Sequence, residues 1–72
     1  MRKIDYRDYV TFEHRHRVKI PYVRDLNIKV DDVLYWLSKG KSFTQIVDRF
    51  PELTITDLEA CLAYAEDHYQ QQ

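Results

Sequence analysis

The spacing of the apolar residues changes at Val30 from the period of a strand to that of a helix. Upstream, residues 9–20 (YVTFEHRHRVKI) are rich in β-branched and aromatic types, and one parity is apolar, which predicts one strand or two. Downstream, apolar residues recur every three or four positions to about Tyr69. We therefore expect an α+β chain, mainly α, in which a short N-terminal β-hairpin or ribbon precedes a helical body.

Local signals divide the helical body into three helices. The first begins at Val30, has acidic residues in its first turn, and stops at Gly40. The second has Ser42 as its N-cap with Gln45 three residues later, a capping box, and ends at Pro51. Two short helices and a tight turn containing Pro51 lead into a third helix, which is the outline of a helix-turn-helix.

The third helix has two possible N-caps, and we favour Thr54, paired with Asp57, over Thr56. Its apolar stripe is predicted to contain Ile55, Leu58, Leu62, Ala65 and Tyr69. Residues 70–72 are expected to be a frayed end. Before the helices, Asp25 and Asn27 are the residues best suited to a turn or a left-handed conformation.

The chain has 72 residues, which is enough for one domain covering 1–72. We divide it into a basic β-rich segment at 1–29, the helix-turn-helix unit at 30–69, and the tail. A core of this size supplies about 3 to 5 kcal/mol, so a homodimer or a folded partner is expected. The lone Cys61 fits a small core residue in a reducing cytoplasm. No stretch resembles a signal peptide or a membrane span.

Positive charge is concentrated in the first half of the chain. Residues 1–36 hold eight Lys or Arg against six Asp or Glu, a net +2, and residues 37–72 hold three against six, a net −3. Read as one strand, the alternation puts Arg15, Arg17 and Lys19 on a single polar face, about 6.6 Å apart. Such a row could bind phosphates, as ribbon-type repressors do, or it could be a solvated face that prevents edge-to-edge aggregation.

The sequence also argues against a metal site at the two histidines and against DNA reading by the third helix. His14 and His16 share a strand face, but no supporting ligand lies at a metal-binding spacing, so we expect no metal and place both rings at the core or a dimer seam. The third helix is a poor reader of DNA, because no Lys or Arg follows Thr54. Contacts with DNA would fall to Thr54 and Thr56 at its start and to Lys41 and Arg49 beside the second helix.

Catalysis and cofactor binding have no support in the sequence. No Gly-rich phosphate loop, nucleophile elbow or pair of carboxylates at a catalytic spacing occurs, so we expect neither an enzyme nor a cofactor. The six tyrosines exceed what so small a core would enclose, and an interface is the alternative to a partly exposed core margin. The rings expected at such an interface are Tyr35, Tyr64 and Tyr69.

Four motifs spread over nearly the whole chain carry a family resemblance: DYVTFE, PYVRDLNIKVDDVLYWLSKG, FPELT and DLEACLAYAEDH. They resemble the domain-of-unknown-function 433 family, small prokaryotic proteins regarded as VapB-like antitoxins. Arg24 matches the motif arginine of the family. Asp25 and Asn27 replace a Gly and an Arg that are common there, and Lys19 and Ile20 replace a Gly-Lys pair.

The resemblance implies an antitoxin, a helix-turn-helix protein that neutralises a PIN-like ribonuclease toxin and represses their shared operon by binding operator DNA. Nucleases of that kind have an acidic, metal-holding active site, into which Arg15, Arg17 or Arg24 could insert with bidentate geometry. The alternative function is a non-catalytic interaction or dimerisation module that binds no nucleic acid.

Overall fold

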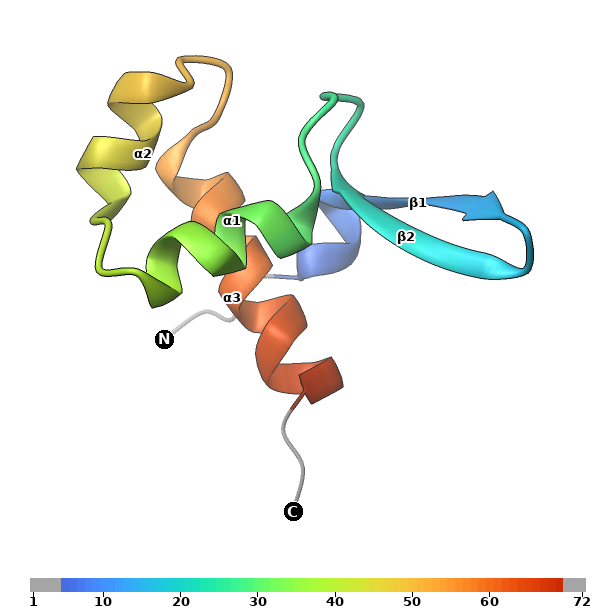
Figure 1. Ribbon diagram of the computed structural model, residues 1–72. Helices are drawn as coiled ribbons and strands as arrows, with labels where there is room; N and C mark the ends of the chain where they lie inside the picture. Colours follow the sequence, from blue (N-terminus) through green and yellow to red (C-terminus); the bar gives the residue numbers. More distant parts are fainter. Residues whose placement is uncertain (1–4, 70–72) are drawn as a thin grey trace.

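A two-stranded antiparallel hairpin followed by three helices makes up the computed structural model, which describes residues 5–69 (Figure 1). The elements are η1 (Tyr6–Asp8), β1 (Val10–Arg15), β2 (Val18–Val23), α1 (Val30–Ser38), α2 (Phe43–Arg49) and α3 (Ile55–Tyr69). The predicted α+β class, mainly α, is confirmed. The predicted frayed end at 70–72 lies outside the described residues.

All three helices begin where the sequence predicted, and capping hydrogen bonds hold the first turns of α2 and α3, whereas Lys29 at the start of α1 makes no side-chain cap. The Ser42 hydroxyl accepts a hydrogen bond from the Gln45 N–H at 3.1 Å, and the Gln45 side-chain oxygen accepts the Ser42 N–H at 2.8 Å. Thr54 and Asp57 form the same reciprocal pair at 2.9 and 3.1 Å. Gly40, at φ +92°, ends the turn after α1 in a conformation that other residues rarely adopt.

The hairpin turns at His16 and Arg17, and the prediction that residues 9–20 continue with one parity is wrong there. Both residues have positive φ, 49° and 70°, as the two central residues of a type I′ turn require. The paired residues run from Arg15 opposite Val18 to Val10 opposite Val23. The turn is easy to miss in the sequence, because neither Asn-Gly nor Asp-Gly stands at these positions.

Beyond β2, the chain reverses in a turn whose central residues are Arg24 and the predicted Asp25, but the left-handed residue is Arg24 and not Asp25 or Asn27. Arg24 has φ +48°, in the left-handed region. Its N–H donates to the Tyr9 carbonyl at 2.8 Å, and the neighbouring Val23 N–H donates to the Ile28 carbonyl at 2.9 Å. The reversal is therefore fixed by hydrogen bonds to both sides, and it returns the chain toward the helices.

The core lies where the base of the hairpin, α1 and α2 pack against α3. Its fully buried aliphatic side chains include Val23, Val30, Val33, Leu53 and Leu58. Two tyrosine hydroxyls tie other elements to the far half of α3. Tyr6 donates to Asp67 at 2.6 Å, and Tyr69 donates to Asp31 of α1 at 2.9 Å. The outer half of the hairpin projects away from this body (Figure 1).

The predicted apolar stripe of α3 does not face the core. Ile55 and Leu62 are each 43% exposed, Tyr69 is 50% exposed, and of the predicted stripe only Leu58 is buried. The buried side of the helix instead carries Asp57, Leu58, Ala60, Cys61 and Tyr64. The core faces this side because η1 and α1 pack against it and because the buried carboxylate of Asp57 has a cationic partner.

Candidate nucleic-acid or partner interface

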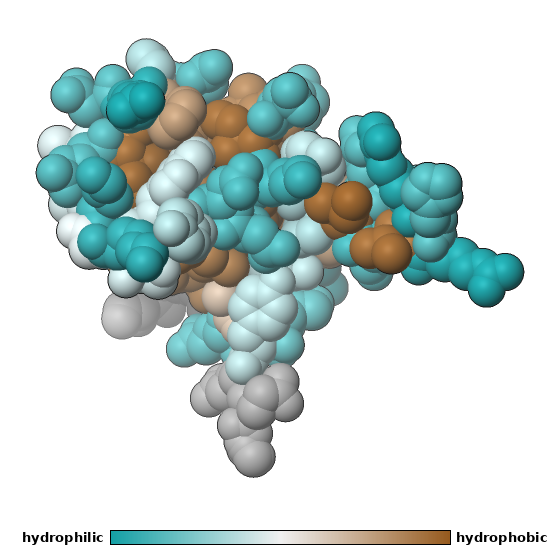
Figure 2. Space-filling model, in the orientation of Figure 1, coloured by the Kyte–Doolittle hydropathy of each residue, from teal (hydrophilic) through white to brown (hydrophobic). Residues whose placement is uncertain are grey.

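The tip of the hairpin, residues 13–20, is the most exposed cationic segment that the structure describes. Residues 13–19 are all exposed, and Ile20 is half-buried. The outer end of the hairpin is covered by hydrophilic residues, and hydrophobic surface is exposed nearer to the helical body (Figure 2). Because the tip packs on no helix of its own chain, its side chains are free to meet another molecule.

The hairpin register distributes the three predicted cations over different directions. Directly opposite residues of an antiparallel pair share a face, so Arg15 lies with Val18, whereas Lys19 lies with His14 on the other face. Lys19 accordingly places its Nζ 4.5 Å from the centroid of the Phe12 ring. Arg17 is in the turn. The expectation of one row of cations is therefore wrong, and a tip with cations on both faces replaces it.

The Arg15 and Arg17 guanidinium groups stay available for binding. Arg15 has one carboxylate near it, Glu13 at 3.5 Å, and both side chains are more than half exposed. An exposed pair of this kind is worth under about 1 kcal/mol. No salt bridge of Arg17 occurs among residues 5–69.

The register also separates the two histidines that sequence parity had put on one face. His14 lies on a strand face and His16 lies in the turn, and both are exposed. Neither ring is at the core, which was one of the two places predicted for them, the other being a dimer seam. Within residues 5–69, no three His, Cys, Asp or Glu side chains are grouped to hold a metal ion.

Arg24 is held by its own chain. Its Nε and Nη2 donate to the two carboxylate oxygens of Asp57 at 2.8 and 2.7 Å, and Nη2 also donates to the Glu52 carbonyl at 3.0 Å. Burial raises the pKa of Asp57, but hydrogen bonds from Arg24 and the Thr54 N–H outweigh this effect and hold that pKa below its usual value. Arg24 therefore joins the end of β2 to the start of α3, and we leave it out of the binding surface.

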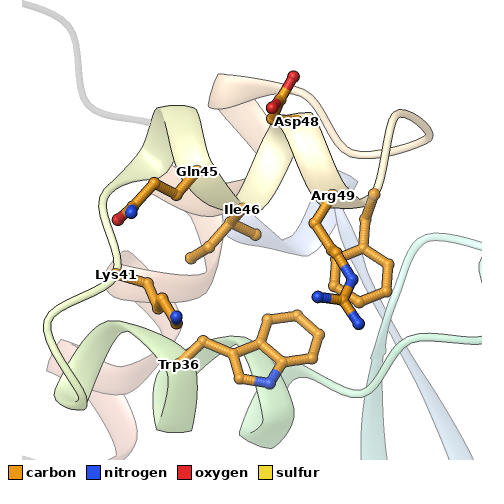
Figure 3. A pocket seen from close by; sticks show the side chains of 7 residues that line it. Trp36, Lys41, Gln45, Ile46, Asp48 and Arg49 are labelled. Carbon is orange, nitrogen blue, oxygen red and sulfur yellow. The ribbon is translucent and has the colours of Figure 1, made fainter.

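Lys41 and Arg49 lie across a cleft between α1 and α2 (Figure 3). The cleft has a volume of about 450 Å³ and an apolar floor of Ile46, Trp36 and Phe50. The rings of Trp36 and Phe50 are stacked at 4.7 Å with 8° between their planes. In Figure 3 the ammonium of Lys41 and the guanidinium of Arg49 both lie beside the indole, whereas the carboxylate of Asp48 points away.

The cleft and the hairpin tip are separate cationic surfaces. Figure 1 places α2 and the hairpin tip at opposite ends of the molecule. Sequence reasoning named Lys41 and Arg49 but missed the cleft between them. The stacking of Trp36 on Phe50 gave no local signal, because the two rings belong to different segments of the chain.

The start of α3 offers little to DNA. Thr54 is exposed, but its hydroxyl accepts the Asp57 N–H at 3.1 Å, and Thr56 is half-buried. The exposed face of α3 carries Glu59 and Glu66, which repel a phosphate backbone. The cations of this chain therefore lie away from the helix that would enter the groove.

The three tyrosines predicted at an interface differ in their exposure. Tyr64 is 6% exposed and belongs to the core, where it stacks on His68 at 4.1 Å and meets Tyr6 edge-on at 5.5 Å. Tyr64 therefore lacks the solvent-exposed ring that the predicted interface required. Tyr35 and Tyr69 are exposed, and the Tyr69 hydroxyl is engaged by Asp31.

Cys61 is fully buried and has no disulfide partner. Burial, with a smaller effect of Asp57, raises the pKa of its thiol to about 12. The thiol is therefore protonated at neutral pH and behaves as a small apolar core residue.

Comparison with known proteins identifies a family but no characterised relative. No match is found among curated proteins or among solved structures. Within the described residues, no helix combines the length and apolar character needed to cross a membrane. A family model described as "Protein of unknown function (DUF433)" matches residues 11–65, from the start of the hairpin to the last turns of α3. The chain belongs to the DUF433 family.

Proposed function

We propose that this chain is a non-catalytic antitoxin that binds an acidic surface of a partner protein through its hairpin tip. The observation that supports this most is the tip itself, a projecting hairpin with exposed Arg15, Arg17 and Lys19. The partner implied by the family resemblance is a PIN-like ribonuclease toxin. Its neutralisation would follow from the chemistry of the two arginines.

A nuclease that holds its metal with clustered carboxylates has a site of strong negative charge. A guanidinium group fits such a site because it donates two parallel hydrogen bonds to one carboxylate and keeps its charge at every physiological pH. Arg17 is best placed for this role, since the turn carries it beyond the ends of both strands. Arg15 would contact the rim of the same site.

Binding of operator DNA is a second activity, supported by Lys41 and Arg49 on the cleft between α1 and α2. Such binding would depend on phosphate contacts from these cations and from the hairpin tip, because the exposed face of α3 is acidic. The chain should therefore show little preference for a particular DNA base sequence, because α3 reads no bases, and its affinity for DNA should fall steeply with salt concentration. The alternative, an interaction module without nucleic-acid binding, gains support from the same acidic face.

The test is to co-express the chain with the product of the neighbouring gene, which the proposal expects to be a ribonuclease, and to measure both binding and RNA cleavage. Arg15→Ala/Arg17→Ala should weaken the complex by about 2 to 5 kcal/mol and restore cleavage, because buried carboxylates of the partner would lose the guanidinium groups that pair with them. Arg7→Ala is the matched control, because Arg7 is exposed and pairs only with Asp5 nearby. Full inhibition by the double variant would refute the proposed mechanism.

Operator binding is tested separately by titrating the DNA upstream of the gene pair with the pure chain. Affinity should fall steeply between about 50 mM and about 200 mM salt, because each phosphate contact releases a counterion. Lys41→Ala/Arg49→Ala should flatten this dependence. The absence of binding at the lower salt concentration would leave protein partnership as the only function.

A further inference from the structure

The exposed side of α3 combines an apolar row with an acidic one. Ile55, Leu62 and Tyr69 are seven residues apart, so they line up along the helix, about 10.5 Å from one to the next. Glu59 and Glu66 form a parallel row beside them. We call these five residues the outer face of α3. Within residues 5–69, Asp31 of α1 and the Tyr64 ring contact Tyr69 at one end of this face, whereas Ile55 and Leu62 each remain 43% exposed.

Close to Ile55 this face continues into a shallow hollow of about 360 Å³. Val47 and Pro51 line it together with Thr44, and Asp48 adds another carboxylate. A cluster of exposed apolar groups bordered by acids, on so small a domain, is a candidate contact surface. It fits a partner surface that is apolar in the middle and cationic at the edge.

The hairpin tip has that composition. Val18 is 55% exposed and shares one strand face with half-buried Ile20 and with Arg15, and Arg17 is in the adjoining turn. A two-stranded hairpin is marginally stable in water unless a further surface covers it. Within residues 5–69, no part of the chain covers the tip, since residues 13–19 are all exposed.

We propose that two copies of this chain form a symmetric dimer in which the hairpin tip of each copy packs across the outer face of α3 of the other. Charge decides between this and simpler arrangements. Two outer faces placed together would bring four glutamates into contact without a cation, since no Lys or Arg follows Arg49. Two hairpin tips placed together would bring six Lys or Arg side chains close to one another, against only the two Glu13 carboxylates.

Reciprocal packing pairs Arg15 and Arg17 with Glu59 and Glu66 twice, and it covers Val18, Ile55 and Leu62. Both contacts are identical under a two-fold axis, so the assembly closes as a dimer. The dimer goes beyond the antitoxin function and does not depend on it, because it is formed by the chain alone. It adds a regulatory consequence, since an acidic partner would compete with the second copy for the same tip.

The test is the association state of the pure chain, measured by analytical ultracentrifugation at about 50 mM and about 500 mM salt. The wild type should dimerise, and the dimer should weaken at high salt. Arg15→Glu/Arg17→Glu and Glu59→Lys/Glu66→Lys should each raise the dimer dissociation constant about a hundredfold or more, because like charges then face each other. Lys39→Glu, which changes an exposed cation away from both surfaces, is the control.

Mixing the two reversed variants should restore association, because both contacts of the mixed dimer again pair opposite charges. The chain with all four reversals should dimerise by itself, as the wild type does. Far-UV circular dichroism checks that each variant is folded. A monomeric wild type at low salt, a dimer that survives the Arg15→Glu/Arg17→Glu change, or a mixture that stays monomeric would each overturn the proposal. None of these experiments includes the toxin, so a failure of the dimer proposal can be distinguished from a failure of the proposed antitoxin function.

Discussion

The ion pair between Arg24 and Asp57 should dominate the stability of this domain, and the two partners should not be equivalent. Asp57 is fully buried, whereas the Arg24 side chain is 36% exposed. Arg24→Ala leaves the buried Asp57 carboxylate with the hydrogen bond that it accepts from the Thr54 backbone N–H. Removal of one partner from a buried pair costs about 3 to 5 kcal/mol. We expect a loss near the upper end of this range.

Asp57→Ala should cost less, about 2 to 3 kcal/mol. The guanidinium group that it leaves behind is partly exposed, so water can replace two of its three hydrogen bonds, and the bond to the Glu52 carbonyl persists. The lost acceptor for the Thr54 N–H accounts for about 1 kcal/mol of this figure. Both losses are large beside the total stability of about 3 to 5 kcal/mol expected for a domain of this size.

The double variant Arg24→Ala/Asp57→Ala gives the sharpest result. It should be more stable than Arg24→Ala alone, because it no longer buries an unpaired charge. Urea unfolding followed by the fluorescence of Trp36, the single tryptophan, ranks the three variants, and the absence of a cooperative transition identifies a variant that is already unfolded in water. Arg7→Ala, which breaks an exposed pair with Asp5, should leave the stability almost unchanged. A double variant that is no more stable than Arg24→Ala alone would refute the reasoning.

Acid should remove the same stabilisation. The pKa of Asp57 is lowered in the folded chain, so the pair contributes its full stability above the unfolded pKa of about 3.9. That contribution is lost as the pH falls through the folded pKa. The difference in unfolding free energy between the wild type and Asp57→Ala should therefore be constant from about pH 7 to about pH 5 and shrink below about pH 4. A difference that stays constant to about pH 2 would contradict the assignment.

Two further predictions concern the turn and the core. His16→Asn/Arg17→Gly should stabilise the hairpin by about 1 kcal/mol, because both positions have positive φ, and a lower midpoint in thermal unfolding would contradict the turn assignment. Cys61 should react with iodoacetamide at pH 8 only as fast as the chain unfolds, because its thiol is buried with a pKa of about 12; rapid labelling of the folded chain, checked by mass spectrometry, would show that the thiol is accessible.

The sequence predicted the helices well because their boundaries depend on neighbours in the chain. The pair of Ser42 and Gln45 and the pair of Thr54 and Asp57 are each three residues apart, and Gly40 acts on its own backbone. Such signals can be read without knowledge of the rest of the fold. The same reading could not show that Asp57 is buried, because its partner Arg24 is 33 residues away.

The buried side of α3 was misassigned for that reason. Apolar periodicity assigns the buried side of a helix from its apolar residues, so an aspartate is assigned to the solvent-exposed side. Asp57 is nevertheless fully buried, so the whole helix is turned relative to the prediction. The predicted stripe of Ile55, Leu62 and Tyr69 then lies outside the core, although its spacing is that of a packing surface.

Two of the errors of sequence reasoning, one in the hairpin and one in the buried side of α3, concern the two surfaces that the proposed dimer brings together. In both segments the apolar pattern is regular, and in both the fold of the single chain leaves part of it uncovered: Val18 in the hairpin, and Ile55 and Leu62 in α3. A pattern of this regularity indicates burial, but it does not say against which chain. If a second copy covers these side chains, the apolar pattern of the sequence matches the residues buried in the dimer better than those buried in the monomer. Arg24 would then act indirectly, because its hydrogen bonds to Asp57 fix α3 in the rotation that presents the outer face to the partner.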